Sequence, residues 1–164
     1  MNLKRCLLVS LIAIILTSCA GNAQITEKEI GVNEKGVYKI TIDQDFLKKV
    51  LEEQLRKDKN DAVLTEFKIK KDVMENDTSK EYFILVAQNK DGSTKIAFDL
   101  ELTDNVFFAR FRELSLVSSC TCSGSCTSGC DPKHRMDDDG YVVWRCSACT
   151  QPGKTCNKSV TDNN

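Results

Sequence analysis

The hydrophobic and polar positions of the chain change period twice along its central region. Residues 37–42 alternate as a short strand does, with every second side chain apolar. The apolar positions then recur at the 3-4 spacing of a helix: Phe46, Leu47, Val50, Leu51 and Leu55. Asp43 can cap the N-terminus of that helix, and polar residues favour an end by Asn60. We therefore expect a short strand followed by one amphipathic helix.

Period-two patterns dominate the next part of the chain and predict three or four strands. The expected strands are 62–71, 81–88, 94–103 and 106–117. Asp91-Gly92 supplies the positive φ of a tight turn, so the second and third of these strands should form a hairpin. The alternation in the last strand changes phase near Glu113.

A single amphipathic helix and several alternating strands bury one another most simply as a helix laid across a twisted antiparallel sheet. We expect an α+β domain at residues 37–118, with the helix on a four- to five-stranded antiparallel sheet. The arrangement is similar to the cystatin-like rolls common in envelope proteins. Residues 20–36 are polar and carry three glycines, which is typical of a tether.

The first eighteen residues have the pattern of a leader. Lys4 and Arg5 precede the apolar stretch Leu7–Leu16, which is too short to span a membrane as a helix. The stretch ends Leu16-Thr17-Ser18-Cys19, which resembles the lipobox of bacterial lipoproteins. An ordinary secretory signal that carries an incidental cysteine is the alternative.

The lipobox resemblance implies cleavage before Cys19, a diacylglycerol on its sulfur and an acylated new N-terminus. Residues 19–36 are then a lipidated tether, and two or three acyl chains give stable anchoring. Ala20 stands where many Gram-negative bacteria use Asp to retain such proteins at the inner membrane. The implied localisation is the cell envelope, at the outer membrane if the host has one.

Charge and composition narrow the possible functions. Loss of Lys4 and Arg5 with the leader lowers the 23 basic side chains to 21, against 24 acidic ones, so the net charge becomes −3. A nucleic-acid partner is not expected, because such binding needs a concentrated basic surface. The predicted sheet domain has no His, no Cys and no phosphate-binding glycine loop, and we do not expect an enzyme.

Residues 119–164 form a separate region that is rich in cysteine and poor in other apolar residues. It carries seven of the nine cysteines: Cys120, Cys122, Cys126, Cys130, Cys146, Cys149 and Cys156. A segment of this composition buries little apolar surface, so crosslinks must hold it if it folds. In an exported protein we expect three disulfides and one leftover thiol, with a pairing that spacing alone cannot choose.

Metal binding is the rival interpretation of the same residues. The seven cysteines and His134 offer eight ligands, enough for two tetrahedral zinc sites. Cys146 and Cys149 have zinc-knuckle spacing, although the first four cysteines do not. In the disulfide interpretation no cofactor is bound, and His134, between Lys133 and Arg135, is expected to be solvated.

Three other features of the region have simple interpretations. Cys146 and Cys149 could form a redox pair, but no βαβ pattern surrounds them. Asp137-Asp138-Asp139-Gly140 predicts a charged hairpin turn rather than a calcium loop. Trp144 is expected to pack over the crosslinks or against the sheet edge.

The sequence thus predicts a membrane-anchored envelope lipoprotein that acts as a non-enzymatic binding or structural module with a disulfide-stabilised tail. A zinc-binding lipoprotein is the second hypothesis, and a thiol–disulfide exchange factor is the third. The expected partners are the membrane, through lipid on Cys19, and an envelope protein or glycan.

Overall fold

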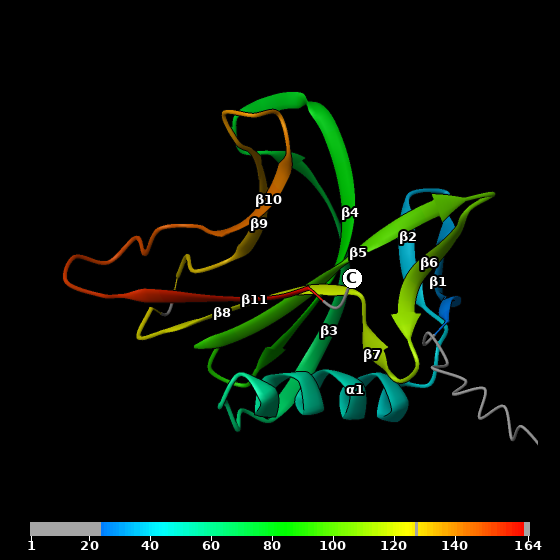
Figure 1. The fold of residues 1–164 in the computed structure, drawn as a ribbon, viewed down its shortest axis with the longest axis horizontal. Helices are drawn as coiled ribbons and strands as arrows, with labels where there is room; N and C mark the ends of the chain where they lie inside the picture. Colours follow the sequence, from blue (N-terminus) through cyan, green and yellow to red (C-terminus); the bar gives the residue numbers. More distant parts are fainter. Residues whose placement is uncertain (1–23, 127, 163–164) are drawn as a thin grey trace, which may run out of the picture.

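The computed structural model describes residues 24–126 and 128–162, and it contains eleven strands and one helix there (Figure 1). In chain order the elements are β1 (Ile25–Glu34), β2 (Val37–Ile40), α1 (Gln44–Lys57), β3 (Leu64–Met74), β4 (Asp77–Asn89), β5 (Thr94–Thr103), β6 (Val106–Arg112), β7 (Ser115–Leu116), β8 (Ser118–Gly124), β9 (Pro132–Met136), β10 (Val142–Cys146) and β11 (Cys156–Asp162). The chain is therefore mostly β, and the prediction of an α+β fold with four or five strands is wrong.

Nine of the strands form one curled antiparallel sheet. Its main path runs β11-β8-β5-β6-β1-β2, with β4 on the other edge of β5, β3 beside β4, and β7 beside β6. Strands β9 and β10 form a separate hairpin. The β4–β5 hairpin turns where the sequence predicts, with Gly92 at φ 71°. The phase break near Glu113 is also confirmed, since this residue has φ 57° and separates β6 from β7.

Helix α1 begins and ends close to its predicted limits. Asp43 Oδ1 accepts a hydrogen bond from the Phe46 amide at 2.8 Å, which satisfies one of the free donors of the first turn. The apolar stripe of the helix faces one side of the sheet and is almost fully buried: Leu47, Val50, Leu51 and Leu55. The stripe packs on the core formed by β1 and β3–β7, around Phe98, Phe107 and Phe111.

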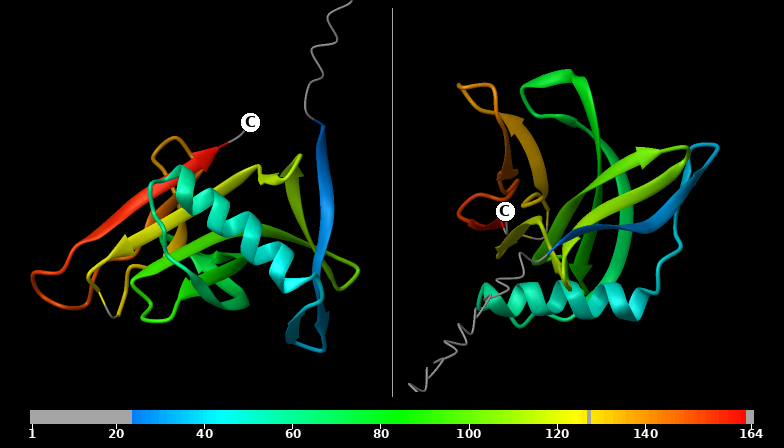
Figure 2. Two further views of the ribbon diagram at one scale, coloured as in Figure 1. Left: turned by 90° about the horizontal axis from the view of Figure 1, so that it is seen from below. Right: turned by 45° about the vertical axis from the view of Figure 1, so that its right-hand side comes forward.

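The opposite face of the sheet is covered as well. In β4 and β5, Leu85 and Phe98 point toward α1, whereas Ile84 and Ala97 belong to a second buried cluster with the tail cysteines and Trp144. Figures 1 and 2 show α1 on one side of the strands and the β9–β10 hairpin on the other. The protein therefore has three layers: a helix, a sheet and a disulfide-linked layer that contains the hairpin.

Two predicted boundaries are corrected by the sheet. Residues 25–34, expected as tether, form β1 and pair with both β2 and β6. Residues 119–164, expected as a separate appendage, contribute β11 and most of β8 to the same sheet, and β8 lies between β5 and β11. The predicted lipidation site Cys19 lies outside the described residues. Within the part of the chain that is described, no helix has the length and apolar character to cross a membrane.

Candidate functional site

Three disulfides link the first half of the cysteine-rich segment to its second half. They join Cys122 to Cys146, Cys126 to Cys149 and Cys130 to Cys156, with Cα–Cα distances of 5.7, 5.7 and 5.5 Å. Of the seven tail cysteines, all of which are described, Cys120 alone is unpaired. The expectation of three bridges and one leftover thiol is confirmed. Each bridge closes a loop of more than twenty residues and stabilises the fold by about 2–4 kcal/mol.

The β9–β10 hairpin docks on the sheet through its aromatic residues. The rings of His134 and Trp144, which pair across the hairpin, have centroids 4.1 Å apart, and the His134 ring lies 4.4 Å from that of Tyr82 in β4. The His134 amide donates to Tyr82 Oη at 3.1 Å, and Trp144 Nε1 donates to Ser118 Oγ at 3.2 Å. Burial raises the pKa of the Tyr82 hydroxyl.

His134 and Trp144 differ in how well the sequence predicted them. The packing of Trp144 over the crosslinks is confirmed. The prediction that His134 is solvated is wrong, because only 5 % of the residue is exposed. The flanking Lys133 and Arg135 suggested solvent, but alternation along β9 places the imidazole on the opposite face of the strand from these two side chains.

The loop between β8 and β9 is also held by a charged contact. Lys95 Nζ on β5 lies 2.7 Å from Asp131 Oδ1 and donates to the Gly129 carbonyl at 2.9 Å. The lysine side chain is only 12 % exposed, so its charge is compensated largely by these two partners. Gly129 has φ 85°, and a Cβ there would lie 2.3 Å from the Ala148 carbonyl oxygen. A side chain at position 129 would therefore clash with the backbone just before Cys149.

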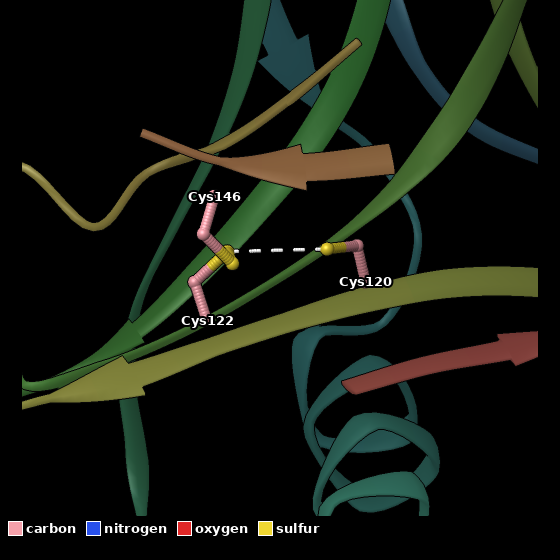
Figure 3. Close-up of side chains that lie close together, drawn as sticks. All are labelled: Cys120, Cys122 and Cys146. Carbon is pink, nitrogen blue, oxygen red and sulfur yellow. Dashed lines mark hydrogen bonds between the residues drawn. A yellow bond between two sulfur atoms is a disulfide. The ribbon is translucent and has the colours of Figure 1, made fainter. Parts of the chain in front are cut away.

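The free thiol of Cys120 lies beside one of the disulfides. Figure 3 shows Cys120 pointing toward the Cys122–Cys146 bond, with the Cys120 and Cys122 sulfurs 3.9 Å apart. The three sulfur atoms all lie within 4.8 Å of one another, and we call them the three-sulfur cluster. Burial raises the pKa of Cys120 to about 12, because the apolar surroundings disfavour the thiolate. The thiol is therefore almost entirely protonated at neutral pH, and only a very small fraction is the reactive thiolate.

The predicted zinc sites require a different arrangement of these residues. Six of the seven cysteines are in disulfides, and disulfide sulfurs do not act as thiolate ligands. His134 lies outside the three-sulfur cluster, with its Nε2 at 3.1 Å from Asp99 Oδ1. The eight-ligand arrangement does not fit this oxidised structure, and zinc binding stays a prediction for a reduced form of the protein.

The cysteine-rich segment also shows how Cys146 and Cys149 are paired and how the turn at residues 137–140 is built. Cys146 and Cys149 do not form a redox pair with each other, because each is bonded to a cysteine from the first half of the segment. The charged hairpin turn is confirmed at residues 137–140. Asp137 Oδ1 accepts from the amides of Asp139 and Tyr141, and Gly140 has φ 84°.

A cleft opens where the strands beside β5 diverge. One edge of β5 pairs with β8 from Thr94 to Ala97 and with β6 from Glu101 to Thr103. Among the described strands none pairs with Phe98–Leu100 on this edge, and a cleft of about 320 Å³ lies there. Asp99, Glu101, Arg110 and Ser118 line the cleft together with apolar residues. It therefore offers both signs of charge, a hydroxyl and the open edge of a strand.

A second cleft, of about 430 Å³, adjoins the first. Both are lined by Asp99 and Ser118, and the second continues to His134, Trp144 and Lys158. The two clefts thus join the open edge of β5 to the disulfide-linked layer. No local pattern in the sequence indicates this site, because the residues of the two clefts come from seven strands, β5 to β11, whose pairing is not evident from any one of them.

Comparison with family models, with curated proteins and with solved structures finds no match to this chain.

Proposed function

We propose that this protein is a lipid-anchored lipoprotein of the bacterial envelope that acts as a non-enzymatic binding module. The lipobox-like sequence at residues 16–19 supports the anchor, and the net charge of the mature chain disfavours a nucleic-acid partner. The clefts beside β5 are the ligand site of the module. The membrane, through lipid on Cys19, and an envelope protein or glycan are its partners.

The break in strand pairing at Phe98–Leu100 is the observation that carries the binding role. Backbone amides and carbonyls seek hydrogen-bond partners, and a strand edge that opens onto a cleft can offer them to a ligand. The surrounding side chains add Arg110 as a donor, Asp99 and Glu101 as acceptors, and Ser118 as both. This set suits a polar ligand with alternating donors and acceptors, as peptide backbones and glycans both have.

The rigidity of the surrounding layer supports the same role. Three disulfides fix the segment that forms the wall at Trp144 and Lys158, so little conformational entropy remains to be lost on binding.

Replacement of Cys19 tests the anchor. In the host cell, Cys19→Ser should leave the precursor uncleaved or release the protein from membranes, because lipid attachment needs the sulfur. Detergent partitioning and intact mass provide the measurement. Unchanged partitioning and mass would show that the protein is not a lipoprotein.

Site-specific photocrosslinking in the host envelope tests the cleft. A photoreactive residue at Arg110, which is exposed and lines the cleft, should give a discrete crosslinked species. The same residue at Lys49, on the exposed side of α1, is the control and should not give that species. Equal crosslinking from both positions, or none from Arg110, would contradict a ligand site at the cleft.

A further inference from the structure

We propose that the three-sulfur cluster is an internal thiol–disulfide exchange unit, in which the free thiol of buried Cys120 can be transferred to Cys146 near the surface. This activity is independent of the lipid anchor and of the cleft. Cys120 Sγ lies 3.9 Å from Cys122 Sγ, and the three sulfurs all lie within 4.8 Å of one another. Cys120 must therefore turn toward the side of Cys122 that faces away from Cys146 before its sulfur can attack in line. Cys120 and Cys122 are fully buried, whereas Cys146 is partly exposed. Exchange therefore moves a reactive group from the interior to the surface.

The exchange balances without any external oxidant or reductant. The Cys120 thiol gives its proton to water, and the resulting thiolate attacks Cys122 Sγ. A Cys120–Cys122 bond forms as the Cys122–Cys146 bond breaks, and the electron pair leaves on Cys146 Sγ. Cys146 then takes up a proton from water, so the numbers of thiols and of disulfides do not change.

The surroundings of Cys146 favour the protonated thiol that the exchange forms there. Its sulfur lies 3.9 Å from the Thr121 carbonyl oxygen and 3.8 Å from that of Asn157, and a thiol at this position can donate to either. In the observed state the Cys120 thiol contacts the Cys122 sulfur, which is a weak acceptor. The product thiol thus has carbonyl acceptors that the starting thiol lacks among the described contacts.

Strand geometry explains why the observed pairing is the resting state. Cys120 and Cys122 are two residues apart on β8, and such positions in an extended strand have Cα atoms roughly 6.6–6.8 Å apart. That spacing is at the upper limit for a disulfide, whereas Cys122 and Cys146 are 5.7 Å apart. The exchanged form should therefore be a minor population that can be captured when Cys146 reacts with a thiol reagent or a small disulfide.

The charged groups around Cys120 set the pH dependence of the exchange. Burial is the main cause of its raised pKa, Lys158 on β11 lowers the pKa, and Asp58 after α1 and Asp99 on β5 raise it. Since the pKa is about 12, the thiolate fraction increases about tenfold for each pH unit between 7 and 10. Exchange should accelerate in the same proportion while proton loss from Cys120 limits it.

Alkylation of the native protein tests the proposal. The mature protein in detergent is treated with iodoacetamide at several pH values from 7 to 10, quenched in acid and mapped by mass spectrometry. The label should be on Cys146, with Cys120 and Cys122 recovered as a bonded pair, and its rate should increase with pH. Label on any other cysteine, or none at pH 10 when guanidinium-unfolded protein labels fully, would overturn the proposal.

A matched variant shows whether Cys120 is the attacking group. Cys120→Ala should abolish labelling of Cys146 and leave the Cys122–Cys146 bond intact. Labelling of Cys146 that persists in this variant would mean that the reagent or hydroxide opens the bond directly, and would overturn the proposal. If the variant does not fold, the position of the label in the wild-type protein still shows whether exchange occurs.

Discussion

His134 Nε2 lies 3.1 Å from Asp99 Oδ1, a contact that joins the β9–β10 hairpin to the central strand β5. The imidazole is buried between two aromatic rings, whereas the Asp99 side chain is 53 % exposed. The pair also lies where the two clefts meet. The hairpin layer is therefore held by ring packing and by a polar contact, in addition to the disulfides.

Removing the imidazole should destabilise the protein. His134→Ala leaves a cavity between Tyr82 and Trp144, and we expect it to lower the free energy of unfolding by about 1–3 kcal/mol. Asp99→Asn is the control that keeps the ring packing, and it should cost less than about 1 kcal/mol because Asp99 is half exposed. Urea unfolding of the oxidised protein measures both. A silent His134→Ala would show that the hairpin does not pack as described.

The helix face offers a test of the other core. Leu51 is fully buried under the sheet, and Leu51→Ala should cost about 2–5 kcal/mol through lost apolar contact and a residual cavity. Glu53 lies on the exposed side of the same helix, so Glu53→Ala should change stability by less than about 0.5 kcal/mol. If the two substitutions lowered the free energy of unfolding by similar amounts, the packing of Leu51 against the sheet would be wrong.

The extent of the sheet predicts the behaviour of a fragment. Residues 37–117 contain every element that the hydrophobic pattern indicates, but they lack β1 and β8. We expect this fragment not to fold cooperatively, because β6 and β5 would each lose a paired strand. A fragment of residues 24–164, which contains α1 and all eleven strands, is the control and should fold under the same conditions. A dispersed amide NMR spectrum from residues 37–117 would contradict the arrangement.

Elements with a strict local period were predictable from the sequence. The α1 stripe, its Asp43 cap and the Asp91-Gly92 hairpin depend on neighbours within a few residues, and the structure confirms all three. The presence of a disulfide framework was predictable because seven cysteines lie beyond the predicted leader and lipidation site, and that predicted leader indicates export.

The missed strands lack such a period. In β1 a bulge between Glu29 and Gly31 shifts the register, so Ile30 reaches the core although it does not fit a simple alternation. In β8 the inward residues on one face are Cys120 and Cys122, and Ser119 and Thr121 are buried on the other. Serine and threonine gave no apolar signal. Their burial depends on β5 and β11, which lie far away in sequence.

The clefts and the disulfide pairing were beyond sequence reasoning for a related reason. Spacing alone cannot select Cys122–Cys146, because the choice follows from the docking of β10 over β8. That docking depends on the burial of Trp144 against the sheet. The divergence of β6 and β8 from β5 likewise depends on register, which the alternation of a single strand does not determine.

Disulfide mapping of the mature protein tests the three-layer arrangement most directly. The protein is isolated without reductant, alkylated under denaturing conditions in mild acid, digested and analysed by mass spectrometry, with metal content measured in parallel. We expect the pairs Cys122–Cys146, Cys126–Cys149 and Cys130–Cys156, with alkylated Cys120 and no stoichiometric metal. Seven alkylated cysteines accompanied by bound zinc, or a predominant pairing other than these three, would contradict the arrangement.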